Sequence, residues 1–88
     1  MNPKREQIID EIINERLRQL ALPGSEWDQR NSPADWIALI THYVSGETRR
    51  NGMKPSGDEY RDNLVKSAAI ILAALEFYDE MKKRGDFR

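Results

Sequence analysis

The sequence contains no cysteine and a single histidine, His42. Disulfide bonds and thiolate metal sites are therefore excluded, and one chain cannot form a zinc site that needs several histidines. No apolar run reaches the roughly 18 residues of a membrane-spanning helix, and the first residues, MNPKREQ, do not resemble a signal peptide. We therefore expect a soluble, cytoplasmic protein with no membrane partner.

An excess of charge of either sign is also missing. The chain has 14 basic and 15 acidic residues among 88, which gives a net charge of −1. Nucleic-acid binding usually requires a clustered basic excess, so nucleic acid is not an expected partner. The length predicts one domain, 1–88, and a domain this small buries a limited share of its surface. Association with partner chains would therefore help to stabilise it.

No stretch alternates apolar and polar residues with the period of a strand, whereas several stretches have the spacing of an α-helix. The first helix is expected over residues 3–20, because Asn2 suits the cap position and Pro3 the first helical position. Its apolar residues recur at helical spacing: Ile8, Ile9, Ile12, Ile13, Leu17 and Leu20. Pro23 and Gly24 then break the pattern, so the segment ALPGSEWDQRNSP is predicted to be a loop.

Two capping boxes mark the starts of the other helices. Ser32 with Asp35 begins the second helix, and Ser56 with Glu59 begins the third. The segment GETRRNGMKPSG between these helices carries turn signals. The predicted fold class is therefore all-α, with a three-helix, antiparallel, bundle-like subunit whose helices lie at about 3–20, 33–46 and 58–84.

The third helix has apolar side chains on two faces. One face carries Tyr60, Leu64, Ala68, Ile71, Leu72, Leu75 and Tyr78, and the other carries Ile70, Ala74, Phe77 and Met81. A helix that is apolar on two sides needs cover on both, and the other helices of the chain can supply one layer. We therefore expect a homo-oligomer, most simply a dimer packed around this helix. In the alternative arrangement, the first two helices straddle the third and cover both faces in a monomer.

An arginine, Arg16, falls within the apolar stripe of the first helix. Burial of an unpaired guanidinium is costly, so Arg16 must find an acid or extend to solvent. Asp35 and Asp62, at the starts of the second and third helices, are the candidate acids. Arg16 would then belong to a buried ion pair that fixes helix packing, or it would face a phosphate in a cleft between helices.

Acidic side chains one helical turn apart suggest a possible metal site. Glu11 and Glu15 repel each other by about 0.2–0.5 kcal/mol, and a divalent cation such as Mg²⁺ would relieve that repulsion. Two solvated glutamates explain the same pattern. Asp62 and Lys66 have the favourable order for a salt bridge within one helix, and an exposed pair of this kind needs no function.

Aromatic side chains are candidates for stacking on a nucleobase. Tyr43 and Trp36 fit the core of the second helix equally well, whereas Trp27 lies in a polar loop, where binding residues are frequent. The sequence has neither a P-loop nor a GxGxxG motif. Phosphates would therefore have to meet separate basic side chains: Arg16, Arg30, Arg49, Arg50, Lys54 or Lys66. Arg49 and Arg50 with Lys54 form the strongest local positive patch, which a solvated linker explains as well.

Several segments together resemble short phage and prophage proteins related to the all-α NTP pyrophosphohydrolases, the MazG-like superfamily. The segments are ERLRQ, GSEWDQ, ADWIALITHY, the KP before the third helix, and RDNLVKSAAIILAALE. The resemblance extends from Ile12 to Asp79, which is most of the chain. Each segment alone has low specificity, and their order and spacing carry the resemblance.

The resemblance implies a fold, a cofactor and a reaction. Active members of the superfamily cleave nucleoside triphosphates to monophosphates and pyrophosphate, with Mg²⁺ held by EExxE and ExxD motifs on two helices. This sequence departs from that pattern, because His42 and Tyr43 fall at or near the paired-glutamate positions. Lys66 also stands where an acid or amide is expected. A substitute metal site would have to use Glu11, Glu15, Asp35 and Asp62.

The preferred hypothesis is therefore a small all-α oligomer that binds a nucleotide or nucleotide-derived ligand without efficient hydrolysis, to sequester it or respond to it. Arg16 and Lys66 would meet phosphate, Trp27 or Tyr43 would meet the base, and Asp62 would orient the basic groups. One alternative is an active Mg²⁺-dependent nucleotide pyrophosphohydrolase. The other is an interaction protein whose second apolar face on the third helix binds a host protein.

Overall fold

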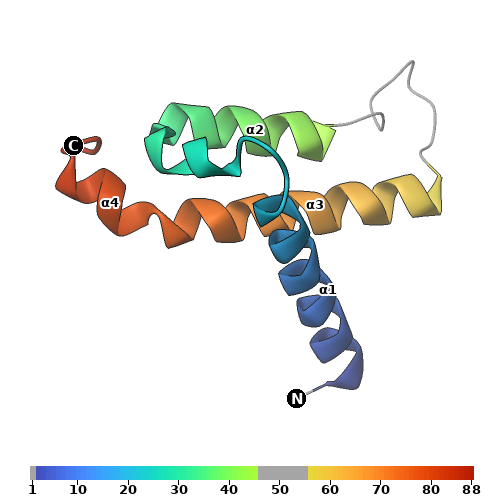
Figure 1. The fold of residues 1–88 in the computed structure, drawn as a ribbon. Helices are drawn as coiled ribbons and strands as arrows, with labels where there is room; N and C mark the ends of the chain where they lie inside the picture. Colours follow the sequence, from blue (N-terminus) through green and yellow to red (C-terminus); the bar gives the residue numbers. More distant parts are fainter. Residues whose placement is uncertain (1, 46–55) are drawn as a thin grey trace.

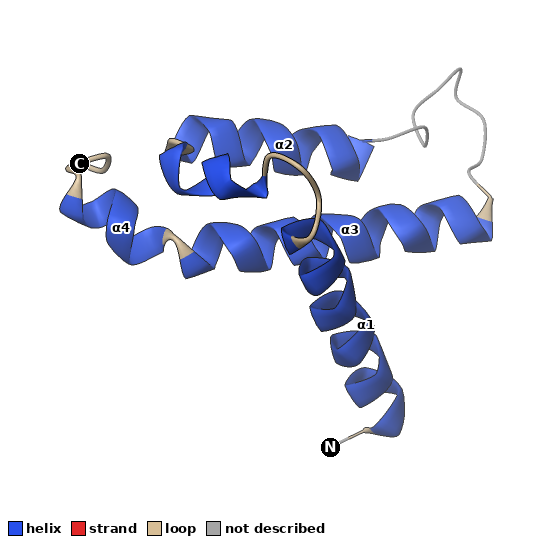
Figure 2. Ribbon diagram, viewed as in Figure 1, coloured by secondary structure: helices blue, strands red, loops and turns tan. Residues whose placement is uncertain are grey.

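The computed structural model describes residues 2–45 and 56–88, and these residues form helices joined by short connections, with no strand among them (Figure 2). The elements are α1 (Pro3–Leu20), the 3-10 helix η1 (Ser25–Arg30), α2 (Pro33–Ser45), α3 (Gly57–Glu76) and α4 (Tyr78–Lys83). The all-α prediction is confirmed. The predicted end of the second helix at residue 46 and the basic patch of Arg49, Arg50 and Lys54 lie outside the described residues. Within the described part, no helix is both long and apolar enough to cross a membrane.

The helices begin where the capping residues predict. In α2 the box is reciprocal, because the Asp35 amide donates to Ser32 Oγ at 3.2 Å and the Ser32 amide donates to Asp35 Oδ2 at 2.9 Å. In α3 the Glu59 amide donates to Ser56 Oγ at 3.0 Å. These bonds satisfy amides that would otherwise have no partner in the first helical turn.

The connection between α1 and α2 is more ordered than the sequence predicts. Gly24 has a φ of +94°, which lies in the left-handed region that favours glycine, and this turn ends the α1 segment. The chain then forms η1 where a loop is expected. The 3-10 helix matters because it carries Trp27 and Asp28 back toward the C-terminal half of α1.

The helices are arranged around α3 (Figure 1). α2 runs antiparallel to α3 and lies beside it, whereas α1 meets α3 near its middle and projects away from it. Both α1 and α2 therefore pack on α3, on different sides. The antiparallel pair of the predicted subunit is present, while α1 crosses α3 instead of running along it.

The core lies between α2, α3 and α4. Its buried members are Trp36, Ile70, Ala73 and Met81, with Ile40, Tyr43, Ala74 and Phe77 packed against them. The rings of Trp36 and Phe77 stack with their centroids 5.8 Å apart. One of the two apolar faces predicted for the third helix is therefore the face that packs against α2.

The third helix differs from its prediction in one respect. A continuous helix over 58–84 is expected, but the structure separates α3 from α4 at Phe77, which has φ −95° and ψ 6°. Helical hydrogen bonds continue on both sides, from the Phe77 amide to Ala73 O at 3.2 Å and from the Met81 amide to Phe77 O at 3.1 Å. Met81 belongs to the core on one side of this break, and the Phe77 ring packs against that core. No proline or glycine marks the break, so periodicity alone does not reveal it.

Candidate functional site

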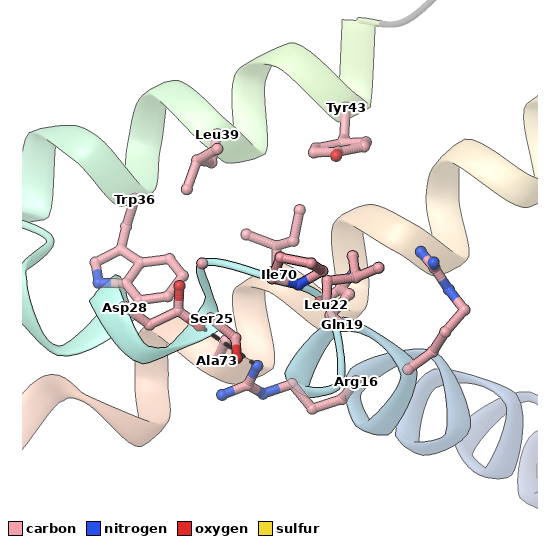
Figure 3. A pocket seen from close by; sticks show the side chains of 13 residues that line it. Arg16, Gln19, Leu22, Ser25, Asp28, Trp36, Leu39, Tyr43, Ile70 and Ala73 are labelled. Atoms are coloured by element: carbon pink, nitrogen blue, oxygen red, sulfur yellow. Dashed lines mark ion pairs between the residues drawn. The ribbon is translucent and has the colours of Figure 1, made fainter.

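A hollow of about 240 Å³ lies where α1, η1, α2 and α3 converge (Figure 3). It forms because the turn at Gly24 folds η1 back beside α1 while α2 lies beside α3. Charged, aromatic and aliphatic side chains share its wall. The lining residues are Arg16, Arg18, Gln19, Leu22, Pro23, Gly24, Ser25, Asp28, Trp36, Leu39, Tyr43, Ile70 and Ala73.

Arg16 is a buried side chain on the wall of this hollow, with 6% of its surface exposed. Its Nε–H donates to Glu76 Oε1 at 2.7 Å, and its Nη1 lies 3.9 Å from Asp28 Oδ2. The prediction that Arg16 pairs with Asp62 or Asp35 is wrong. The reason is the position of the helix crossing, which brings Arg16 to the C-terminal part of α3 and to η1, whereas both predicted acids lie at helix starts.

Small side chains make this crossing possible. Ala69 and Ala73 of α3 are 0% and 1% exposed, and they lie on the helical stripe that also carries Glu76. Because alanine projects little from the helix, the backbones of crossing helices can approach closely there. The long Arg16 side chain then reaches Glu76, and the Glu76 carboxylate compensates the charge of the buried guanidinium.

The two acids around Arg16 have different roles. Glu76 is half exposed and makes the short contact, whereas the Asp28 side chain is 25% exposed and lies at the longer distance. Burial raises the pKa of Asp28 above its ordinary value, and the attraction of Arg16 offsets this only in part. Glu76 is therefore the main partner of Arg16, and Asp28 is an acid held in a partly desolvated position.

A second group of charges lies between α1 and the first half of α3. Arg18 binds Glu15 through two bonds, Nε to Oε1 at 2.9 Å and Nη2 to Oε2 at 2.6 Å, and Gln19 adds a third at 3.1 Å. On α3, Lys66 Nζ lies 2.9 Å from Asp62 Oδ2, so the predicted salt bridge is present.

The pKa shifts connect these two pairs. Arg18 holds the pKa of Glu15 below its ordinary value, and Lys66 contributes to the same shift. Asp62 raises the pKa of Lys66, with a smaller contribution from Glu15. Glu15, Asp62 and Lys66 therefore belong to one local electrostatic group beside the hollow, although only the neighbouring Arg18 and Gln19 line it.

The aromatic candidates fall in different places. Tyr43 is half-buried and lines the hollow, as does the buried Trp36, whose Nε1–H has no hydrogen-bond partner in the structure. Trp27 is 51% exposed and is not part of the lining. The guanidinium carbon of Arg30 lies 4.2 Å from the centre of the Trp27 ring, a cation–π contact. Tyr43 is thus the base-binding candidate that lines the same hollow as Arg16.

The four acids considered for a metal site have separate partners. Glu11 forms an ion pair with Arg61 across α1 and α3, while Asp35 is engaged by Ser32. The bonds from Ser32 also hold the pKa of Asp35 below its ordinary value. Over residues 2–45 and 56–88, no group of three or more acidic or histidine side chains is placed to hold a metal ion. The described structure does not bring Glu11, Glu15, Asp35 and Asp62 together.

Several lining residues were not singled out from the sequence. Asp28 and Ser25 lie in the predicted loop, and a loop offers no periodicity from which a direction can be inferred. Gln19 is indicated only as a polar residue at the edge of the apolar stripe of the first helix. Glu76, which binds Arg16 without lining the hollow, is indicated only as a member of a polar stripe on the third helix. In the sequence, the part of the hollow formed by η1 is indicated only by the segment GSEWDQ, which carries part of the MazG-like resemblance.

The comparisons with known proteins add no relative to this description. No family model matches the chain, and no curated protein or solved structure matches it. The site is therefore interpreted from its own residues.

Proposed function

We propose that this protein binds a nucleotide or nucleotide-derived ligand in the hollow between α1, η1, α2 and α3, without efficient hydrolysis. The observation that supports this proposal is that Arg16 of α1 and Tyr43 of α2 line the same hollow. A nucleotide presents phosphate oxygens and a flat base, which such groups bind by charge-assisted hydrogen bonds and by stacking. Ligand pockets usually measure roughly 300–1,000 Å³, so this smaller hollow would enclose part of the ligand.

The phosphate end would lie toward the arginines. The Arg16 guanidinium has five N–H donors, and its contacts with Glu76 and Asp28 leave donors for an anion. Arg18, on the same helix, also lines the hollow. Lys66, in the adjoining charge group, adds positive potential there, and Asp62 orients its ammonium. The tertiary contacts of Arg16 fix its position before a ligand arrives, which lowers the entropic cost of binding.

Calorimetric titration tests this proposal. Nucleoside mono-, di- and triphosphates and cyclic nucleotides should include at least one that gives a saturable heat at micromolar concentrations. Tyr43→Ala should weaken that binding roughly tenfold, which corresponds to about 1.4 kcal/mol of lost stacking. Trp27→Ala is the matched control, because Trp27 does not line the hollow. The nucleotide affinity of this variant should equal that of the wild type. Absence of heat with every nucleotide would contradict the proposal.

The alternative activity, Mg²⁺-dependent cleavage of nucleoside triphosphates, would need Glu11, Glu15, Asp35 and Asp62 around one ion. In the described residues these acids are engaged with separate partners. The alternative is tested by pyrophosphate release with and without Mg²⁺. Release that requires Mg²⁺ and disappears in Asp62→Ala would establish it in place of simple binding.

We further propose that the chain is a homo-oligomer, with the bundle completed between copies. The chain exposes 6854 Å², whereas a compact monomer of its mass, 10.2 kDa, is expected to expose about 5,300 Å². The difference, about 1,500 Å² per chain, is of the size that obligate dimers bury on each partner. The exposed surface includes large apolar residues on α1 and α3, among them Ile9, Ile13, Leu17, Leu64 and Leu75.

Light scattering coupled to size-exclusion chromatography measures this property directly. The expected mass is at least twice the chain mass of 10.2 kDa at micromolar concentration. A mass of one chain across the accessible concentration range would contradict self-association. If a pull-down then recovered one stoichiometric partner and no nucleotide bound, the chain would be the interaction protein of the second alternative.

A further inference from the structure

An uncovered apolar stripe runs along α3 and α4 on the side away from α1 and α2. We call it the outer stripe, and its members are Tyr60, Leu64, Ala68, Ile71, Leu75 and Tyr78. Five of these six residues are exposed, from Ile71 at 42% to Leu75 at 67%, and Ala68 is half-buried. Large apolar side chains in a continuous row are unusual on the surface of a monomer and mark an interaction site.

The residue types along the outer stripe follow nearly the same order from its N-terminal end as from its C-terminal end. Tyr60 at one end corresponds to Tyr78 at the other, and Leu64 corresponds to Leu75. Ala68 and Ile71 lie on either side of the midpoint, so each would face the other in a second copy. Two identical helices packed antiparallel place corresponding residues opposite each other, as a two-fold contact requires.

The charges beside the outer stripe follow the same symmetry. Arg61 lies at its N-terminal edge, and Asp79 lies at the equivalent C-terminal edge of the same side. An antiparallel copy would bring opposite charges together at both ends, whereas a parallel copy would bring like charges together. Rim charges of this kind chiefly select the orientation of the partner.

We infer that a second copy of this chain covers the outer stripe, with α3 packed antiparallel on α3 of its partner about a two-fold axis between Ala68 and Ile71. This inference rests on the self-association proposed above and specifies its geometry. The small Ala68 side chain near the axis allows the helices to approach closely, with axes about 8 Å apart. The large residues Leu64 and Leu75 then pack against each other on both sides of the axis.

Cysteine cross-linking tests this geometry, because the native chain has no cysteine and only introduced thiols can react. In the proposed contact, Ala68 and its copy are offset by about 4.5 Å along the helix axes, which is within the reach of a disulfide. Leu64 and its copy are offset by about 16 Å, which is out of reach. Mild oxidation should therefore link Ala68→Cys to itself and should leave Leu64→Cys unlinked.

A mixed experiment tests the register. Leu64→Cys and Leu75→Cys, one of them carrying a short tag, should form a mixed disulfide when combined, and neither should form one alone. Ile71→Cys repeats the test near the axis, and circular dichroism verifies that each variant is helical.

The possible failures can be distinguished. Monomeric protein by light scattering would remove self-association itself. A dimer in which Leu64→Cys links to itself, or in which neither Ala68→Cys nor Ile71→Cys does, would overturn only the antiparallel arrangement.

Discussion

Arg16 illustrates, at the scale of single residues, how a charge is held inside a small helical domain. Its guanidinium is buried, its short bond goes to Glu76, and Asp28 lies farther away. Because Glu76 remains half exposed, this ion pair is not fully desolvated and its net contribution is smaller than that of a deeply buried pair. Only 6% of the whole Arg16 residue is exposed, so burial of its aliphatic stem adds to that contribution.

We predict that Arg16→Ala lowers the free energy of unfolding by about 2 kcal/mol, because it removes both the ion pair and the packed stem. Urea denaturation at fixed protein concentration measures the change. Arg18→Ala is the comparison, since Arg18 is about half exposed and pairs within its own helix, and an exposed pair contributes about 0.5 kcal/mol. Equal losses in the two variants would contradict the structural role assigned to Arg16.

At the scale of elements, the helix starts are determined locally and the helix ends less so. The boxes at Ser32 and Ser56 fix where α2 and α3 begin. Each depends on a hydrogen bond from a backbone amide to a side-chain oxygen three residues earlier, so no other part of the chain is required. The division of α3 from α4 occurs at Phe77, whose ring stacks on Trp36 of another helix, and no local signal accompanies it. Local signals therefore predict helix starts and miss this break.

The capping box of α2 predicts a pH dependence of stability. The Ser32 amide and hydroxyl hold the pKa of Asp35 below the ordinary aspartate value of about 3.9. A group whose pKa is lowered by folding contributes stability above its unfolded pKa, and the contribution is lost as pH falls through the folded pKa. Stability should therefore fall below about pH 4, and the fall should be shallower in Asp35→Asn.

Urea denaturation at neutral pH and at about pH 3 measures this difference. Ser32→Ala removes the hydroxyl of the same box, and it should lower stability at neutral pH by about 1 kcal/mol. An identical acid dependence in wild type and Asp35→Asn would show that the box does not contribute to it.

At the scale of the whole molecule, the chain has more surface than its mass requires. The Cα radius of gyration is 14.6 Å, whereas a compact domain of 88 residues is expected to measure about 12 Å. The projection of α1 away from α3 contributes to this extended shape (Figure 1). A chain with few buried hydrophobic residues and long exposed stripes would gain stability in the oligomer that we propose.

We therefore expect folding and association to be coupled. Because the oligomer is favoured at high concentration, the melting temperature should rise with protein concentration. Thermal unfolding followed by circular dichroism over a hundredfold range of concentration measures this effect. A constant melting temperature in protein that light scattering shows to be oligomeric would mean that the single chain is stable alone.

The sequence by itself determined the helical class, the helix starts and the two apolar faces of α3, because capping and periodicity depend on neighbours within a few residues. It also identified Arg16 as a side chain that needs an acid. Only the tertiary structure decided that this acid is Glu76, that η1 brings Asp28 close to Arg16, and that Tyr43 rather than Trp27 lines the hollow beside them. A helical pattern gives the direction of a side chain around its own axis, while the crossing point of two helices depends on the small residues and turns of the whole chain.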